Sequence, residues 1–215
     1  SLRPEDGETL AGEPEFFAEL PFRTGHPQLR AQNFHPSKFL PDPTSWLIYV
    51  PFEDCEYRLG ASLLAQALGS SGAMAPQIVD PDYFIDCYEV VRELVEDGVV
   101  LSGVTVGRGG LISALKRMTG PKIGASVELA DLVRATGEKD IVRLLFAEVP
   151  GVLFQIADID YDYVDAELLL QDIAFYPLGH PVPGKPGVDI ISSDKPGIQT
   201  ILESLIRSQS SEGED

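Results

Sequence analysis

The sequence predicts an α/β fold, in which short strands and helices alternate along one chain. Apolar eight-residue runs, rich in β-branched and aromatic side chains, recur at 45–52, 99–106, 122–129 and 151–158. Between them lie segments with helical periodicity, several of which end at a glycine. Alternation of this kind indicates helices layered on a sheet, in contrast to a helical bundle or a β-sandwich.

The length and composition are those of one globular domain with appendages. The chain has 215 residues, of which 44% are hydrophobic and 23% are charged. No apolar run approaches the roughly 20 residues that a membrane-spanning helix needs, so the sequence disfavours a membrane protein. The net charge of −18 disfavours nucleic acid as a partner, because binding to a phosphate backbone depends on clustered Lys and Arg.

Composition divides the chain into an arm, a domain and a tail. Residues 1–43 are acidic and proline-rich, with scattered apolar residues, which is typical of a linker or an extended arm. The patterned segment 44–193 is the predicted domain. Residues 194–215 are expected to form a final helix at about 198–207 and a disordered tail.

The predicted domain opens with a strand and a short helix. The run 45–52 is apolar, aromatic and β-branched, as buried strands are. Within 58–72, a turn precedes a cluster of leucines and alanines. Ser62 is the expected N-cap of that helix, and Gly69 is its expected end.

A longer amphipathic helix is predicted within 80–98. Pro81 suits the first helical turn, where its fixed φ and missing N–H cost little, and Gly98 marks the end. Apolar residues recur at helical spacing and are expected to face the core: Phe84, Ile85, Tyr88, Val91, Leu94 and Val95.

The remaining segments continue the alternation. Further strands are predicted at 99–106, 122–129, 151–158 and 188–191, and further helices at 110–120, 140–151 and 163–174. The helix within 140–151 is expected to run into a loop. The segment 175–182 holds two prolines and is expected to be a loop as well.

The cysteines and histidines form no recognisable site. Cys55 and Cys87 lack metal-ligand or redox spacing, and we expect buried free thiols in a reducing, cytoplasmic compartment. His26, His35 and His180 are far apart in the sequence, and each adjoins a proline in a loop-like segment. Nucleophile elbows, zinc patterns and paired carboxylates are absent too, so we expect no catalytic residue and no metal ligand.

The most suggestive local motif is VTVGRGGL at 104–111. A strand that ends in a glycine-rich turn and opens a helix can direct backbone N–H groups and the helix dipole at one anion. The motif lacks the wider glycine spacing and the Lys-Ser/Thr pair of a nucleotide-binding loop. It therefore allows an anion site without identifying the anion.

Three further motifs surround this one in a fixed order. Leu-Gly-Ala-Ser and a following Ala-Gln pair occupy 59–66, Leu-Phe-x-Glu-x-x-Gly occupies 145–151, and Tyr-Pro-Leu-Gly-His-Pro-Val occupies 176–182. Together the four motifs resemble the C-terminal domain of the aminoimidazole ribonucleotide synthetase superfamily, and within it the copy in phosphoribosylformylglycinamidine synthases of purine biosynthesis. The resemblance covers roughly 45–182. It implies a three-layer domain, with a mixed β-sheet and packed helices.

The chain departs from that family at the glycine turn. Where the family has His-Asp-x-Ser-Asp/Glu-Gly-Gly-Leu, this chain has Val104, Thr105, Val106, Gly107, Arg108, Gly109, Gly110 and Leu111. The glycine pair and the leucine remain, whereas the His, the Asp, the Ser and the acid are replaced. Arg108 adds a fixed cation that suits phosphate or carboxylate. The turn can hold an anion, but not through the family's full set of contacts.

The resemblance implies one part of a larger ligase, which converts formylglycinamide ribonucleotide to the amidine with ATP and glutamine-derived ammonia. ATP and magnesium would be held by a separate N-terminal domain, and the partners would be that domain or a paired homologous one, together with a glutaminase. The fragment alone would bind no cofactor and would be inactive. Substrate-phosphate contacts are expected from these residues: Gly60, Ala61, Ser62, Gly107, Arg108, Gly109 and Gly110.

Other interpretations stay open at this point. Both turns could merely connect a strand to a helix, or the domain could be a degenerate, non-catalytic copy kept for its interfaces, which the altered motif and the aromatic-rich arm favour. Another branch, such as thiamine-monophosphate kinase or selenophosphate synthetase, fits the motifs at 59–66 and 145–151 less well. Glu148 is expected to be a water-exposed carboxylate at a helix end, without a catalytic role.

Overall fold

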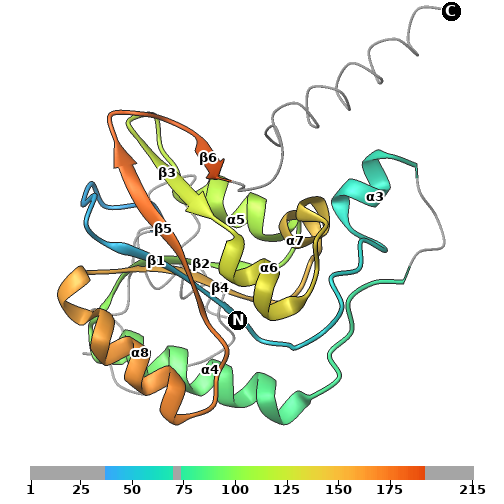
Figure 1. Cartoon of the computed structure of the whole chain (residues 1–215), viewed down its shortest axis with the longest axis horizontal. Coiled ribbons are helices and arrows are strands. Elements are labelled where there is room, and N and C mark those ends of the chain that lie inside the picture. The colour runs from blue at the N-terminus through green and yellow to red at the C-terminus, as the bar shows by residue number, and fades with distance from the viewer. Residues whose placement is uncertain (1–36, 70–73, 192–215) are drawn as a thin grey trace, which may run out of the picture.

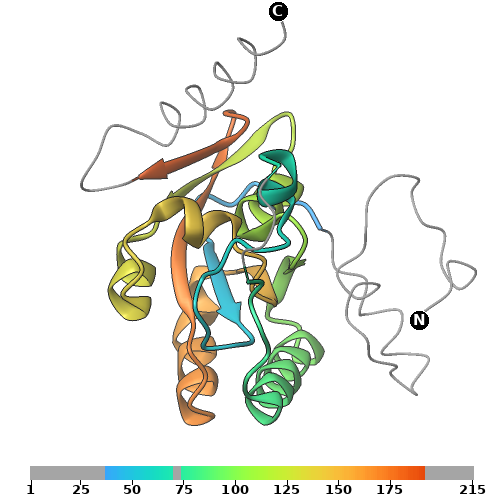
Figure 2. The same ribbon diagram turned by 90° about the vertical axis from the view of Figure 1, so that its right-hand side faces the viewer.

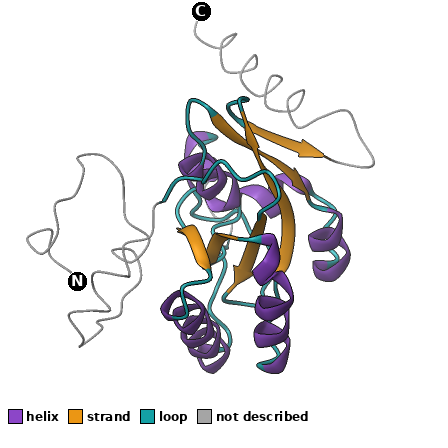
Figure 3. Ribbon diagram, turned by 90° about the vertical axis from the view of Figure 1, so that its left-hand side faces the viewer, coloured by secondary structure: helices purple, strands orange, loops and turns teal. Residues whose placement is uncertain are grey.

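The computed structural model describes residues 37–69 and 74–191. Six strands form one mixed sheet in the order β2-β4-β1-β5-β3-β6, in which only the β3–β6 pair is parallel. The strands are β1 (Trp46–Pro51), β2 (Val100–Val106), β3 (Ile123–Glu128), β4 (Gly151–Ile156), β5 (Tyr176–Pro183) and β6 (Val188–Ile191). Helices cover both faces of the sheet (Figures 1 and 3), as the predicted three-layer α/β fold requires.

One pair of helices lies against one face of the sheet, and three helices lie against the other (Figure 1). The pair consists of α4 (Pro81–Glu96) and α8 (Tyr161–Leu170), which follows the short 3₁₀ turn η2 (Asp158–Asp160). The opposite face carries α5 (Gly110–Met118), α6 (Ala130–Thr136) and α7 (Ile141–Phe146), with α3 (Leu63–Ala67) beside them. No helix in the described ranges is both long and apolar enough to cross a membrane.

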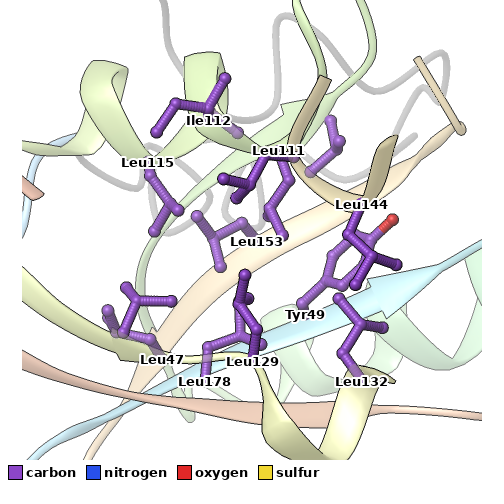
Figure 4. Packing of buried hydrophobic residues seen from close by; sticks show 14 of the residues in the cluster. Leu47, Tyr49, Leu111, Ile112, Leu115, Leu129, Leu132, Leu144, Leu153 and Leu178 are labelled. Carbon is purple, nitrogen blue, oxygen red and sulfur yellow. The ribbon is translucent and has the colours of Figure 1, made fainter. Parts of the chain in front are cut away.

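Alternation along β1 separates two hydrophobic cores. Leu47 and Tyr49 point into the core beneath α5, α6 and α7, which Figure 4 shows, whereas Ile48 and Val50 point into the core beneath α4 and α8. Successive side chains of a strand face opposite sides of a sheet, so a fully apolar strand suits a position between two helical layers. All four of these residues are at most 1% exposed.

Local signals placed the first two helices well. The Ser62 hydroxyl accepts a hydrogen bond from the N–H of Ala65 (3.1 Å), which confirms the predicted N-cap of α3. The second helix, α4, begins at Pro81 as predicted and ends before Gly98, whose φ of +78° is left-handed. The predicted apolar stripe of α4 was wrong at Ile85, which is 54% exposed. Cys87 lies about 200° further round the helix and faces the core instead.

One strand and one α-helix were not predicted. The expected loop at 175–182 is the strand β5, between β1 and β3, so His180 lies in a strand, where its Nδ1 is 2.9 Å from the carbonyl oxygen of Ser45. The helix α6 was not expected at all. Its signal is Gly137, which follows Thr136 with a left-handed φ of +70°.

The two thiols differ in burial. Cys87 is fully buried as predicted, whereas Cys55 is only half-buried, and neither forms a disulfide. Burial raises the pKa of the Cys55 thiol, and the neighbouring carboxylates of Glu53 and Asp54 add to that rise. Neither thiol is therefore a readily formed thiolate.

Only the last part of the predicted arm, from residue 37, lies within the described residues. Residues 1–36, which include His26 and His35, and residues 192–215, which include the predicted helix at 198–207, lie outside the described residues. The last part of the arm packs on the domain. Phe39 is 3% exposed and its N–H donates to the carbonyl oxygen of Met118 (2.8 Å).

Candidate functional site

The two predicted turns meet in space. The turn at 60–62 opens α3 and the turn at 107–110 opens α5, and Figure 2 shows α3 close to α5 near the top of the view. A Cβ atom on Gly109 would lie 3.5 Å from Cδ1 of Leu63, the first residue of α3. Segments that are more than 40 residues apart in the sequence thus form one surface.

Glu148 joins the two turns directly. Its Oε1 atom accepts hydrogen bonds from the N–H of Leu63 (2.8 Å) and from the N–H of Gly109 (2.9 Å). The expectation of a water-exposed carboxylate was therefore wrong, because Glu148 is half-buried and bonds to the first turns of two helices. A carboxylate at a helix N-terminus meets unpaired N–H donors and a favourable dipole. The sequence could not indicate this, since the partners are 85 and 39 residues away.

The glycine pair of the second turn is required by geometry. Gly109 and Gly110 have left-handed φ angles of +85° and +69°. A Cβ atom on Gly110 would lie 2.5 Å from the carbonyl oxygen of Leu145 and 2.9 Å from that of Ala147. Only glycine fits a backbone that is both left-handed and this close to another backbone. Gly110 therefore packs α5 against the segment that carries Glu148.

The first turn is held by hydrogen bonds within it and by a bond to a later segment of the chain. Gly60 donates its N–H to the carbonyl oxygen of Met74 (3.0 Å), and Ala61 has a left-handed φ of +57°. The Ser62 hydroxyl is buried, donates to the carbonyl oxygen of Leu59 (2.6 Å) and accepts from Ala65. The hydrogen bonds of this hydroxyl in the structure are thus those of a cap.

Exposure divides the predicted site residues into two groups. Gly60, Ser62, Gly109 and Gly110 are buried, and their contacts hold the turns together. Ala61 and Arg108 are exposed and Gly107 is half-buried, so these residues form the accessible part. The Arg108 side chain makes no hydrogen bond or ion pair with any residue in the described ranges. Arg108 is the charged residue among these three, and its guanidinium suits an anionic ligand.

Of the four replaced family positions, 104, 105, 107 and 108, only Val104 lies in the core, next to Val106 at the family's variable position. Val104 and Val106 are 0% and 3% exposed and pack beneath α5. Thr105 is half-buried, and its carbonyl oxygen accepts a hydrogen bond from the Arg117 guanidinium. Within the described residues, no three His, Cys, Asp or Glu side chains gather in a way that could hold a metal ion. The residues present do not fit a magnesium site, and we assign no metal-dependent step to them.

Comparison with known protein families identifies the domain. Residues 58–180 match the family described as AIR synthase related protein, C-terminal domain. The chain belongs to this family. The match includes both turns and Glu148, so the site lies wholly within the AIR synthase-related domain.

Individual relatives extend this result. This chain is 27% identical over 121 residues to the phosphoribosylformylglycinamidine synthase of Homo sapiens, an alignment that covers 56% of this chain and 9% of that protein. The chain thus spans less than a tenth of the length of that curated relative. The predicted relation to phosphoribosylformylglycinamidine synthases is confirmed at the level of homology.

Solved structures agree on the fold. PurLQS from Thermotoga maritima superimposes with a TM-score of 0.54 at 15% identity, covering 75% of this chain and 26% of that one. T. maritima PurL complexed with FGAR superimposes with a TM-score of 0.53 at 16% identity, covering 77% and 32%. At these identities the likeness concerns the fold, and it places the six-stranded sheet and its helices among PurL-like structures.

Proposed function

We propose that this chain is the C-terminal domain of a phosphoribosylformylglycinamidine synthase-like ligase of de novo purine biosynthesis. In that ligase, formylglycinamide ribonucleotide is converted to the amidine with ATP and glutamine-derived ammonia. The domain contributes contacts to the substrate phosphate and interfaces to other domains, and it is inactive alone. ATP and magnesium are held by a separate N-terminal domain, and a glutaminase domain or subunit supplies ammonia.

One observation carries the phosphate role. Glu148 joins the turns at 60–62 and 107–110 into one unit, and the Arg108 guanidinium stands exposed on that unit without a protein partner in the described ranges. Because Glu148 already occupies the N–H groups of Leu63 and Gly109, those two donors are not free for a phosphate. Arg108 is therefore the principal phosphate contact, since a guanidinium can bind two phosphate oxygens at once.

Calorimetric titration with formylglycinamide ribonucleotide tests this role. The protein used is the full-length ligase that carries this domain, as the wild type and as Arg108→Ala. Loss of a charge-assisted contact is expected to weaken binding roughly 10- to 100-fold. Lys116→Ala is the matched control, because Lys116 is an exposed cation near the other end of the same helix α5. Unchanged affinity in Arg108→Ala would reject the phosphate role.

A second candidate function has a specific observation in its favour. Val104 and Val106 are buried in the apolar core, and the carboxylate of Glu148 is engaged by backbone, so this surface has few groups left for chemistry. Those features suit a degenerate copy that serves as a structural or interaction domain. In that case Arg108→Ala leaves both ribonucleotide binding and ligase turnover of the full-length protein unchanged, whereas deletion of the domain prevents assembly of the remaining domains.

A further inference from the structure

Glu148 connects the start of α3 with the start of α5. A single carboxylate oxygen, Oε1, accepts from the N–H of Leu63 and from the N–H of Gly109. The N-cap position of α5 is Gly109, which has no side chain to cap its own helix. Glu148, from another segment, accepts the N–H of this N-cap residue itself, and the same oxygen accepts the N–H of Leu63, the first residue of α3.

The backbone around Glu148 is fixed independently of this bridge. Its neighbours Ala147 and Val149 are 2% and 1% exposed and belong to the hydrophobic core. The carbonyl oxygens of Leu145 and Ala147 press against Gly110, where a Cβ atom would come within 2.5 to 2.9 Å of them. Packing thus sets the position of the Glu148 backbone, and the side chain then sets the position of the turn at 60–62.

The negative charge of Glu148 strengthens both of its hydrogen bonds. Hydrogen bonds to an ionised carboxylate are roughly twice as strong as those between neutral groups. The carboxylate also lies at the N-terminal ends of two helices, where negative charge is favourable. A neutral amide in its place would keep the acceptor oxygen but lose the charge.

We infer that Glu148 is a positioning residue of the proposed site. It holds the turn at 60–62 against the turn at 107–110, and so places Arg108 relative to Ala61, without contacting the ligand itself. The expected effect of Glu148 on ligand binding rests on the proposed function. The bridge itself can be tested without any ligand.

Hydrogen exchange of backbone amides tests the bridge in this chain. In Glu148→Ala, the amides of Leu63 and Gly109 are expected to exchange roughly tenfold faster or more, with a smaller rise in Glu148→Gln. Glu128→Ala is the control, because Glu128 is exposed and lies on β3. Unchanged exchange at both amides in Glu148→Ala overturns the inference. A uniform rise that includes the amides of β3 also overturns it, because that result means general destabilisation.

Binding to the full-length ligase tests the consequence. The two probes are formylglycinamide ribonucleotide and the corresponding riboside, which lacks the phosphate. Glu148→Ala is expected to weaken ribonucleotide binding roughly tenfold and to leave riboside binding within about twofold of the wild type. Glu148→Gln, which keeps the acceptor oxygen, is expected to restore most of the ribonucleotide affinity. Equal weakening of both probes would mean a general structural role and overturns the inference.

The two proposals can fail separately. If Arg108→Ala leaves ribonucleotide binding unchanged, the proposed phosphate role fails, whatever the exchange rates at Leu63 and Gly109. If Arg108→Ala weakens ribonucleotide binding and Glu148→Ala does not, the proposed function survives and the positioning role of Glu148 is rejected.

Discussion

The glycines of the turn at 107–110 have different structural roles, and substitution separates them. Gly110 combines a φ of +69° with two carbonyl oxygens within 2.9 Å of a Cβ atom. Gly110→Ala is therefore expected to lower the free energy of unfolding by about 2 kcal/mol or more, through left-handed strain and overpacking. Denaturation in urea measures the change.

Gly107→Ala is the matched control for that substitution. Gly107 has no left-handed φ, and a Cβ atom on it would meet no atom within 4 Å. Its free energy of unfolding is expected to stay within about 0.5 kcal/mol of the wild type. Equal losses in the two variants would contradict the assignment of the packing role to Gly110.

Residues of the candidate site could be predicted from the sequence only where their roles depend on neighbours close in the chain. The glycines and Ser62 could be selected because turns and caps depend on residues close in the sequence. The bridging role of Glu148 was missed, because its two donors are far away in the chain. An acid three residues before a buried strand was the available signal, and it indicated neither the partners nor the burial.

At the scale of elements, local chemistry explains what was predicted and what was missed. The strand at 45–52 has a continuous apolar run, and the helix α4 has an apolar periodicity with signals at both ends. Both elements were predicted correctly. The strand β5 contains Pro177, Pro181 and Pro183, and prolines are usually excluded from a strand with neighbours on both sides. The pairing of β1 with β5 shifts register between Leu47 and Ile48, an irregularity that only the assembled sheet reveals.

A buried thiol at the contact between α4 and β1 makes the free energy of unfolding vary with pH in the alkaline range. The Cys87 thiol is buried there, with its Sγ 3.8 Å from the carbonyl oxygen of Pro51. Burial raises the pKa of this thiol from 9.0 to about 11. Between these values the unfolded chain releases the proton and the folded chain keeps it, so the free energy of unfolding falls as pH rises. Below pH 9 and above about pH 11, the thiol adds nothing to the change of the unfolding free energy with pH.

Urea denaturation across this pH range measures the contribution. Cys87→Ala is expected to show a shallower loss of stability between pH 9 and 11 than the wild type, because the titrating group is gone. Val90→Ala, a buried neighbour on α4 without an ionisable group, controls for the cavity: it lowers stability at every pH and keeps the wild-type slope. Identical slopes in Cys87→Ala and the wild type would show that the thiol does not contribute.

At the scale of the whole molecule, the segment at 37–40 ties the predicted arm to the domain. The ammonium of Lys38 donates to the carbonyl oxygens of Arg117 (2.8 Å) and Thr119 (3.0 Å), at the C-terminal end of α5, where a cation is favourable. Leu40 exchanges two hydrogen bonds with the buried side chain of Gln155 on β4. The predicted boundary at residue 44 would remove all of these contacts.

Truncation tests whether this segment is part of the folding unit. A chain that begins at residue 44 is expected to lose about 3 kcal/mol or more of unfolding free energy relative to one that begins at residue 37, since it lacks the buried Phe39 ring and leaves Gln155 with fewer partners. Phe39→Ala in the full chain should reproduce most of that loss, whereas Leu40→Ala, at a side chain 38% exposed, should cost far less. Equal stability of the two truncated chains would instead place the domain boundary at residue 44, because the contacts of 37–40 would then add nothing to folding.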